Sequence, residues 1–173
     1  MLIRKAEIKD IPAVGQIYEE IHTEEETGRT IIGWIRGIYP TEATALQALN
    51  RGDLFVAETN GEITGAAIIN QQQVDVYTQA CWKYAARDEE VMVLHTLVIS
   101  PLKAKQGYGK AFVKYYEDYA LENGCRYLRI DTNARNLRAR GMYERLGYQE
   151  AGIVPCKFNG IDGVQLVLLE KKL

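Results

Sequence analysis

The stretch from Leu97 to Ala120 constrains the fold most, because it changes from a strand pattern to a helix pattern across one short turn. The β-branched apolar run that ends at Ile99 indicates a buried strand. Pro101 ends this strand, since proline offers no N–H group to a ladder. From Ala111 onward, apolar residues recur with helical spacing. We therefore expect a strand, a glycine turn and the start of a helix in direct succession.

The turn has the composition of an anion-binding site. It comprises Lys103, Ala104, Lys105, Gln106, Gly107, Tyr108, Gly109 and Lys110. Backbone N–H groups at a helix N-terminus are unpaired, and the helix dipole adds partial positive charge there. Gly107 and Gly109 let the backbone approach a phosphate without a Cβ in the way. The lysines could neutralise phosphates, but surface lysines are mostly solvated, so the backbone N–H groups rank first.

Two common phosphate motifs do not fit this turn. A P-loop needs a glycine and a Ser or Thr where Ala104 and Ala111 stand. A Rossmann fingerprint needs a third glycine where Phe112 stands. The turn alone is therefore either a short cradle suited to a pyrophosphate or an ordinary strand-to-helix connection that binds nothing.

A second motif follows the predicted strand Tyr127–Asp131 and reads NLRARGMYERLGY from Asn136 to Tyr148. Together the two motifs resemble the GNAT superfamily of N-acetyltransferases, whose later motif reads N-x-x-A-x-x-x-Y-E-K-L-G-F. The residues that match in register are Ile99, Pro101, Gly107 and Gly109 in the turn, and Asn136, Ala139, Tyr143, Glu144, Leu146 and Gly147 in the second motif. Ala104 departs from the family's usual Arg or Gln.

The resemblance covers the chain from about Leu54 to its end, and it implies a fold and a cofactor. We expect one domain over residues 1–173, of the α/β (α+β) class, with a three-layer α/β/α arrangement. Its mixed sheet would be splayed, so that the pantetheine arm of acetyl-CoA enters between two strands. No metal is expected.

The resemblance also implies which residues contact acetyl-CoA. The thioester would lie beside the strand residues, with backbone N–H groups, especially that of Val98, as donors to the oxyanion. The Asn136 amide could bond the pantetheine and cap its helix at once. The expected cofactor-binding residues are Leu97, Val98, Ile99, Ala104, Lys105, Gln106, Gly107, Tyr108, Gly109, Lys110, Asn136 and Tyr143.

Tyr143 stands where the family's general acid stands, facing the thioester sulfur. A phenol has a reference pKa of about 10, so it is protonated at neutral pH and can donate a proton. Tyr143 also lies on the apolar stripe of its helix with Met142 and Leu146. Periodicity alone favours a packed aromatic residue, whereas its register in the motif favours the acid.

His95 is the candidate general base. Strand alternation places it on the same face as Leu97, beside the expected thioester. Imidazole has a reference pKa of about 6.5, which suits proton removal near neutral pH. In the family a Glu often stands at this place and some members have a His. A hydrogen-bonded core histidine, the nearby Glu89 and Glu90, and a water chain without a dedicated base are the alternatives.

The rest of the chain predicts further elements. The strands are expected at Leu2–Ala6, Leu54–Glu58, Ile63–Asn70, Val91–Ile99, Arg126–Asp131, Tyr148–Lys157 and Val164–Lys171. Asp10 should cap a helix that ends near Gly28, and Thr41 a second helix that Gly52 ends and whose Leu46 faces the core. Asn60-Gly61 predicts a hairpin turn, and Cys81–Ala86 a short helix.

Composition narrows the function classes. The net charge of −2 offers no basic field for nucleic acid. The three cysteines lie in no metal-ligand spacing and read as reduced cysteines of a cytoplasmic protein. We find neither a signal-peptide pattern nor an apolar run long enough for a membrane span.

These observations together predict an acetyl-CoA-dependent N-acetyltransferase that acetylates a primary amine of a small molecule by direct attack on the thioester. Two alternatives stay open: a protein or peptide N-acetyltransferase, and a non-catalytic acyl-CoA-binding sensor on the same fold. We expect a small-molecule amine as partner, no nucleic acid and no membrane, and leave a homodimer open. A fold alone does not identify the acceptor.

Overall fold

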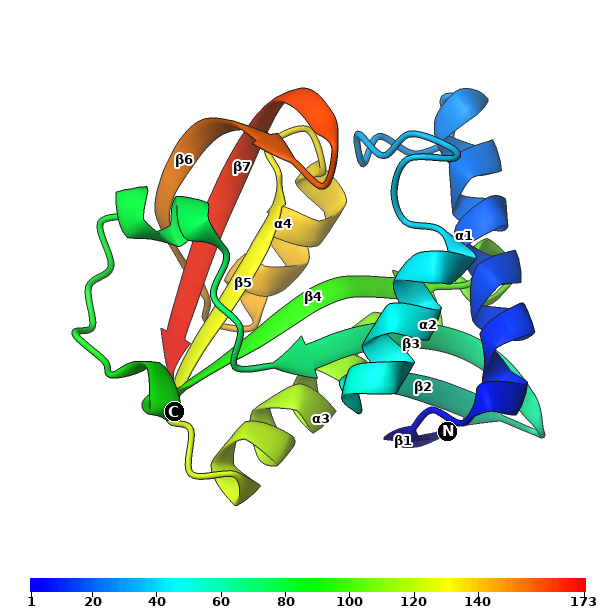
Figure 1. Ribbon diagram of the computed structural model, residues 1–173, viewed down its shortest axis with the longest axis horizontal. Coiled ribbons are helices and arrows are strands. Elements are labelled where there is room, and N and C mark those ends of the chain that lie inside the picture. Colours follow the sequence, from blue (N-terminus) through cyan, green and yellow to red (C-terminus); the bar gives the residue numbers. More distant parts are fainter.

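The computed structural model describes residues 1–173 and contains one seven-stranded sheet in the order β1-β2-β3-β4-β5-β7-β6 (Figure 1). The strands are β1 (Leu2–Lys5), β2 (Leu54–Thr59), β3 (Glu62–Asn70), β4 (Val91–Ile99), β5 (Tyr127–Asn133), β6 (Gln149–Phe158) and β7 (Ile161–Lys172). The α-helices are α1 (Ile11–Glu26), α2 (Glu42–Arg51), α3 (Tyr108–Glu122) and α4 (Leu137–Arg145). Only β4 and β5 pair in parallel, so the sheet is mixed, as predicted.

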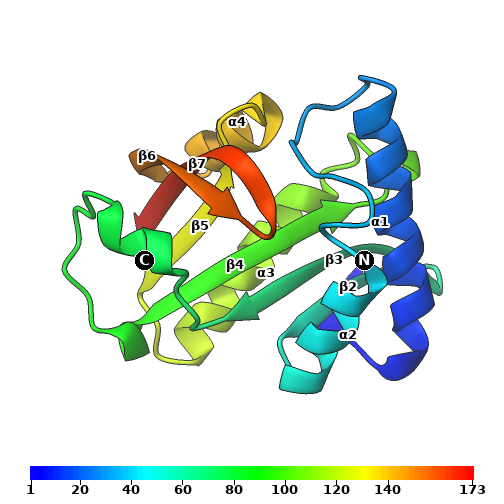
Figure 2. The same ribbon diagram turned by 45° about the horizontal axis from the view of Figure 1, so that its top comes forward.

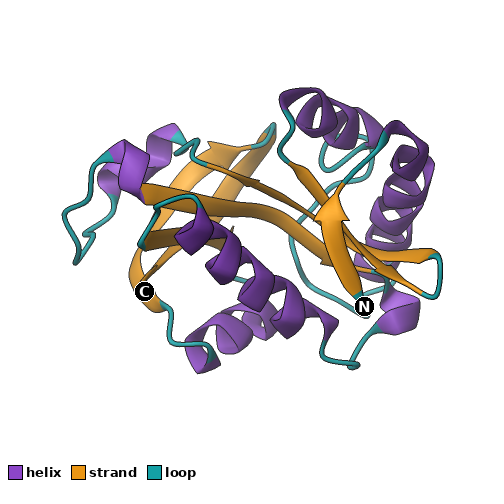
Figure 3. Ribbon diagram, turned by 90° about the horizontal axis from the view of Figure 1, so that it is seen from below, coloured by secondary structure: helices purple, strands orange, loops and turns teal.

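Helices cover both faces of the sheet, which gives the predicted three layers (Figure 3). One core joins α1 and α2 to the sheet through residues such as Val14, Ala45 and Val56. The core on the other face joins α3 and α4 to the sheet and includes Phe112 and Tyr143. No helix is long and apolar enough to cross a bilayer.

The sheet splits between its two parallel strands. β4 and β5 pair only from Val91 to Leu94 and from Tyr127 to Ile130. Beyond these residues β5 continues against β7, and β4 continues against β3. Figures 1 and 2 show the two strands diverging from their common start. The facing edges of both strands therefore carry backbone groups that no neighbouring strand satisfies.

A β-bulge in β4 accompanies the split. Ala66 pairs with Val98 and Ile68 with His95, so two residues of β4 oppose one residue of β3. Thr96 has a left-handed backbone with φ of 49°. The bulge corrects one prediction: Leu97 packs on the α3 and α4 face, whereas His95 keeps the opposite face, because the extra residue breaks strict alternation.

Most predicted turns and caps are confirmed. Thr41 caps α2 by accepting a hydrogen bond from the Thr44 N–H, and Gly52 ends that helix with φ of 75°. Asn60 and Gly61 have φ of 53° and 80°, as the predicted hairpin turn requires.

Three further predictions were wrong. The Asp10 side chain makes no capping bond to α1, because Arg4 and the Glu7 N–H occupy its carboxylate. Leu46 is exposed, since the smaller Ala45 and Ala48 form the buried face of α2. No helix forms at residues 81–86; short 3₁₀ turns lie instead at Asp75–Gln79 and Asp88–Glu90.

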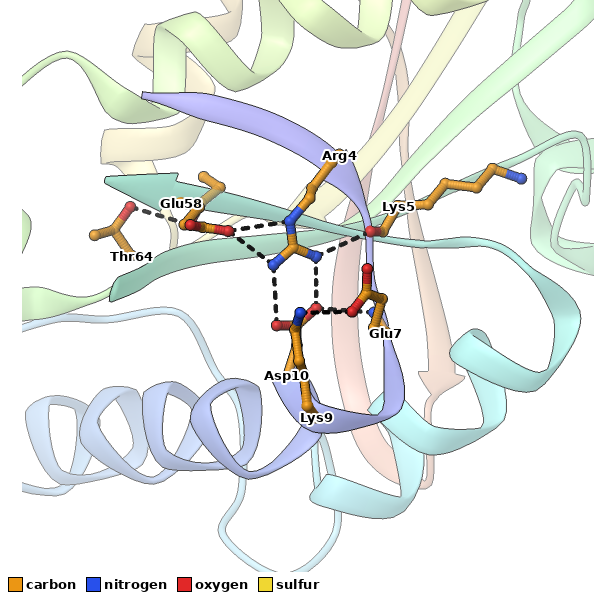
Figure 4. Close-up of polar contacts among 8 residues, drawn as sticks. Arg4, Lys5, Glu7, Lys9, Asp10, Glu58 and Thr64 are labelled. Carbon is orange, nitrogen blue, oxygen red and sulfur yellow. Dashed lines mark hydrogen bonds and ion pairs between the residues drawn. The ribbon is translucent and has the colours of Figure 1, made fainter. Parts of the chain in front are cut away.

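An ion-pair cluster ties the N-terminal strand to its neighbours (Figure 4). The Arg4 guanidinium donates to both Asp10 oxygens, at 2.7 and 3.1 Å, and to Glu58 Oε2 at 2.8 Å. The side chain of Asp10 is only 4% exposed, and its Oδ2 also accepts from the Glu7 N–H. The hydrogen bond from Arg4 is the main reason that the pKa of Asp10 lies below its usual value.

We predict that Asp10→Asn lowers the free energy of unfolding at pH 7 by about 1.5–3 kcal/mol, the worth of hydrogen bonds to a charged group. Because the folded pKa is depressed, this stabilisation exists above the unfolded pKa of about 3.9 and disappears as the pH falls through the folded pKa. Urea unfolding at pH 7 and below pH 4 measures both effects. Asp118→Asn, on the exposed face of α3, is the matched control. An equal loss at both pH values would contradict the assignment.

Candidate active site

A cavity of about 1270 Å³ occupies the split in the sheet. One side is lined by the turn at the start of α3 (residues 103–110, the α3 turn), by β4 from Leu94 to Ile99, and by α4. The other side is lined by the segment between α1 and α2 (residues 27–41, the α1–α2 segment), by the end of β5 and by the β6–β7 hairpin. The cavity therefore connects the predicted anion site to the far face of the sheet.

The α3 turn presents its backbone donors without using them. No backbone N–H group from Lys105 to Lys110 donates a hydrogen bond within the protein. Gly107 has φ of 82°, a conformation that glycine adopts without strain. A Cβ on Gly109 would lie 3.3 Å from Met142 Sδ, so glycine lets the first turn of α3 approach α4. Such a row of free donors at a helix start can hold an anion.

The structure brings nearly all predicted cofactor-binding residues to this cavity. Leu97, Val98 and Ile99 line it from β4, and the residues of the α3 turn from Lys103 to Lys110 line it with the exception of Gln106. Asn136 lines it too, while its Oδ1 caps α4 by accepting from the Ala139 N–H at 3.2 Å.

Tyr143 lies on α4 with its ring buried and in edge contact with Tyr148. It packs in the core, as its periodicity predicts, and it also lines the cavity, so the general-acid role stays a prediction. Burial raises the pKa of its phenol, with a smaller contribution from Asp131. The phenol is therefore protonated at neutral pH and can donate a proton into the cavity.

His95 lines the cavity from the face of the sheet opposite to the one that α3 and α4 cover. Its Nε2 lies 3.2 Å from both Asn70 Oδ1 and the Gln72 carbonyl oxygen. Asn70 is oriented by its Nδ2, which donates to Asp53. Because both neighbours of Nε2 are acceptors, Nε2 carries the proton, and Nδ1 is the basic nitrogen. Burial lowers the pKa of His95 below 6.5, which keeps the imidazole neutral at pH 7.

Sequence reasoning missed Asp131, at the end of β5. Its Oδ2 lies 3.8 Å from His95 Nδ1 and accepts a hydrogen bond of 2.8 Å from the Tyr77 hydroxyl. Burial raises the pKa of the Asp131 carboxyl, while His95 and Tyr77 oppose that shift. Asp131 had no motif around it, and only the pairing of β5 beside the split brings it to His95.

The bulge itself is held from outside the sheet. The Tyr39 hydroxyl and Thr96 Oγ1 share a hydrogen bond that ties the α1–α2 segment to β4. Tyr39 and Trp34 both line the cavity. Two other aromatic residues of the irregular segments have different contacts. The Tyr77 hydroxyl donates a hydrogen bond to Asp131, and the Trp82 ring packs against the Arg129 guanidinium, whose Cζ lies 4.0 Å from the ring centroid.

Glu89 and Glu90, the other candidate bases, do not line the cavity. They precede β4 at the end where it pairs with β5, and both form ion pairs with Arg87. The split opens at the other end of the strand, beyond Leu94. Of the three side chains that the sequence offered as a base, His95, Glu89 and Glu90, the structure brings only His95 to the cavity.

Comparisons with known proteins agree with this geometry. The model of the acetyltransferase (GNAT) family matches residues 14–148. The uncharacterized N-acetyltransferase YhfO of Bacillus subtilis is 25% identical over 152 residues, which cover 87% of this chain and 91% of that protein.

Solved structures share the fold. An acetyltransferase of the GNAT family from Streptococcus agalactiae superposes with a TM-score of 0.84 at 20% identity, over 99% of this chain and 95% of that one. The acetyltransferase yncA from Salmonella typhimurium, whose structure holds acetyl-CoA, superposes with a TM-score of 0.69 at 18% identity, over 100% of this chain and 94% of that one.

Proposed function

Because this chain belongs to the acetyltransferase (GNAT) family, we propose that it transfers the acetyl group of acetyl-CoA to the primary amine of a small molecule. The observation that carries the proposal is the single cavity that joins a row of free N–H groups, a protonated phenol and a neutral imidazole. These are the parts that direct acetyl transfer requires. A cytoplasmic enzyme and a homodimer remain predictions, and sedimentation of the purified protein tests the second.

Acetyl-CoA would lie along the split. Its pyrophosphate would accept from the N–H groups of the α3 turn, with Lys105 and Lys110 close to its charge. The pantetheine would pass between β4 and β5, with the Asn136 Nδ2 as a donor. The register with β3 corrects the prediction for Val98, because Val98 opposes Ala66 and its N–H group points to β3, as that of Ser100 does when it donates to Thr64. The thioester carbonyl would then face the unpaired edge of β4 at Leu97 and Ile99, whose N–H groups can stabilise an oxyanion.

The acetyl transfer depends on proton movements. The ammonium form of the acceptor gives one proton to His95 Nδ1, and the lone pair that this leaves on the nitrogen then attacks the thioester carbon. When the tetrahedral intermediate collapses, the C–S bond breaks and the sulfur takes a proton from the Tyr143 hydroxyl. The nitrogen then loses its second proton, which restores the Tyr143 hydroxyl, and His95 returns its proton to solvent. The products are the N-acetylated amine and CoA.

Closure of the acceptor side favours a small molecule. A Cβ on Gly160 would lie 3.1 Å from Ile38, so the β6–β7 hairpin meets the α1–α2 segment (Figure 2). A Cβ on Gly33 would lie 2.4 Å from Asn133 Nδ2, so the same segment also meets the end of β5. These contacts narrow the acceptor side of the cavity, which supports a small molecule rather than an extended polypeptide as the acceptor.

We predict that Tyr143→Phe lowers kcat by about 10²–10⁴-fold, because it removes the proton donor and keeps the buried ring. The KM for acetyl-CoA should stay within about twofold. Thiol release at saturating acetyl-CoA measures both values. Tyr119→Phe, on the outer part of α3, removes a phenol away from the cavity and serves as control. A kcat within a factor of two of wild type would make Tyr143 a packing residue.

We predict that His95→Gln lowers kcat/KM for the amine about tenfold or more, because glutamine cannot take the proton; a tenfold loss corresponds to about 1.4 kcal/mol. In wild type, kcat/KM should rise with pH through an apparent pKa below 6.5, since burial lowers the pKa of His95. The variant should lose this limb. Binding of acetyl-CoA, measured by calorimetry, should not change.

Two results would contradict this assignment. If His95→Gln keeps the rate and the full pH profile, a water chain takes the proton. If wild type binds acetyl-CoA and turns over no amine in a broad panel, the non-catalytic sensor is the better description.

A further inference from the structure

Asp131 places a carboxyl group at the acceptor end of the cavity without a fixed cation beside it. Its side chain is 10% exposed and lines the cavity. Its one ion-pair neighbour is His95, at 3.8 Å, and burial keeps that imidazole neutral. No Lys or Arg side chain forms an ion pair with Asp131.

The groups that surround Asp131 are neutral at pH 7. The ionisable side chains with a charge interaction with Asp131 include Tyr39, Tyr77, His95, Tyr143 and Cys156, while Arg51 and Asp53 act on His95. The arginines on the acceptor side of the cavity are already paired. Arg29 binds Glu24 at 2.8 Å and Arg51 binds Asp53 at 2.9 Å. At the acceptor end of the cavity, Asp131 is therefore a carboxyl group that no Lys or Arg side chain pairs with.

Such an arrangement is costly for the unliganded protein. A buried carboxylate is rarely stable unless a positive group pairs with it, and its pKa rises until the cost is relieved. Burial does raise the pKa of Asp131. A cation that enters the cavity would lower that pKa again and stabilise the carboxylate.

We propose that Asp131 anchors the ammonium group of the acceptor, and that the enzyme therefore selects aliphatic primary amines over neutral arylamines. The proposal rests on the proposed function and names the substrate class of the same site. An aliphatic ammonium has a pKa of about 10.4, so it is the main form of such an amine at pH 7. An arylamine is uncharged there and gains nothing from the carboxylate.

The geometry gives the ammonium a place between two acceptors. Asp131 Oδ2 and His95 Nδ1 lie 3.8 Å apart, too far for a hydrogen bond between them. One nitrogen can lie at about 2.7–3.2 Å from both atoms. The ammonium would donate to the carboxylate and to Nδ1. When one N–H bond breaks, its electron pair stays on the amine, and the new imidazolium rests beside Asp131.

Tyr77 is then a positioning residue. Its buried hydroxyl donates to Asp131 Oδ2 from a 3₁₀ turn outside the cavity lining. This bond aims the carboxylate at His95 and leaves Oδ1 free of protein donors.

The test is calorimetric binding of phenethylamine and aniline, an aliphatic and an aromatic amine, to the protein loaded with CoA at pH 7. Wild type should bind phenethylamine at least tenfold more tightly than aniline. Asp131→Asn should weaken phenethylamine binding by tenfold or more and leave aniline and CoA binding within twofold. Asp118→Asn repeats the change of charge outside the cavity and should alter none of these values.

The outcomes separate the anchor from the proposed function. Equal losses for both amines would make Asp131 a structural residue and overturn the proposal. Equal binding of both amines by wild type would overturn it without any variant, even if Asp131→Asn does not fold. Selective amine binding without acetyl transfer would keep the anchor and refute the enzyme. Efficient transfer to aniline as well as phenethylamine would keep the enzyme and refute the anchor.

Discussion

The site depends on one break in hydrogen bonding, where β4 and β5 stop pairing after four residues. Buried backbone groups almost always find partners, so an unpaired edge inside a sheet invites a ligand that satisfies it. The bulge at Thr96 and Leu97 turns β4 away from β5 at this point. The same break supplies the volume of the cavity and the free donors that line it.

Burial then sets the protonation states of the groups around that break. It raises the pKa of Tyr143 and lowers that of His95, so the proposed acid is protonated and the proposed base is neutral near pH 7. Both shifts favour the roles that acetyl transfer to an amine needs. Burial raises the pKa of the Asp131 carboxyl, so a cationic partner would stabilise its ionised form. The three groups come from three elements, and only the folded sheet gathers them.

Local sequence patterns predicted much of the fold and part of the candidate site. Gly107 and Gly109 predicted the α3 turn because the local backbone geometry there needs glycine. The turn residues of the first hairpin were predicted for the same reason. His95 and Tyr143 were found through strand and motif register. The bulge was not found, because Thr96 is not a residue that usually marks a left-handed backbone. It moved Leu97 to the other face of the sheet.

The remaining misses share one cause, which is contact between segments distant in the chain. Asp10 is a residue type that often caps helices, but its carboxylate binds Arg4 instead. In the sequence, Asp131 is only a polar residue at the end of a strand. The fold brings it beside Tyr77 and His95, which lie 54 and 36 positions earlier in the chain. Side-chain partners of this kind follow from strand order and register, which local periodicity does not determine.

A crystal structure with acetyl-CoA bound tests the central claim most directly, because the claim concerns where the thioester lies. The account predicts the pyrophosphate at the N–H groups of residues 105–110 and the thioester carbonyl oxygen within hydrogen-bond distance of the N–H group of Leu97 or Ile99 in β4. The thioester sulfur should face the Tyr143 hydroxyl. A cofactor that lies outside the split between β4 and β5, or that leaves the α3 turn empty, would contradict the account.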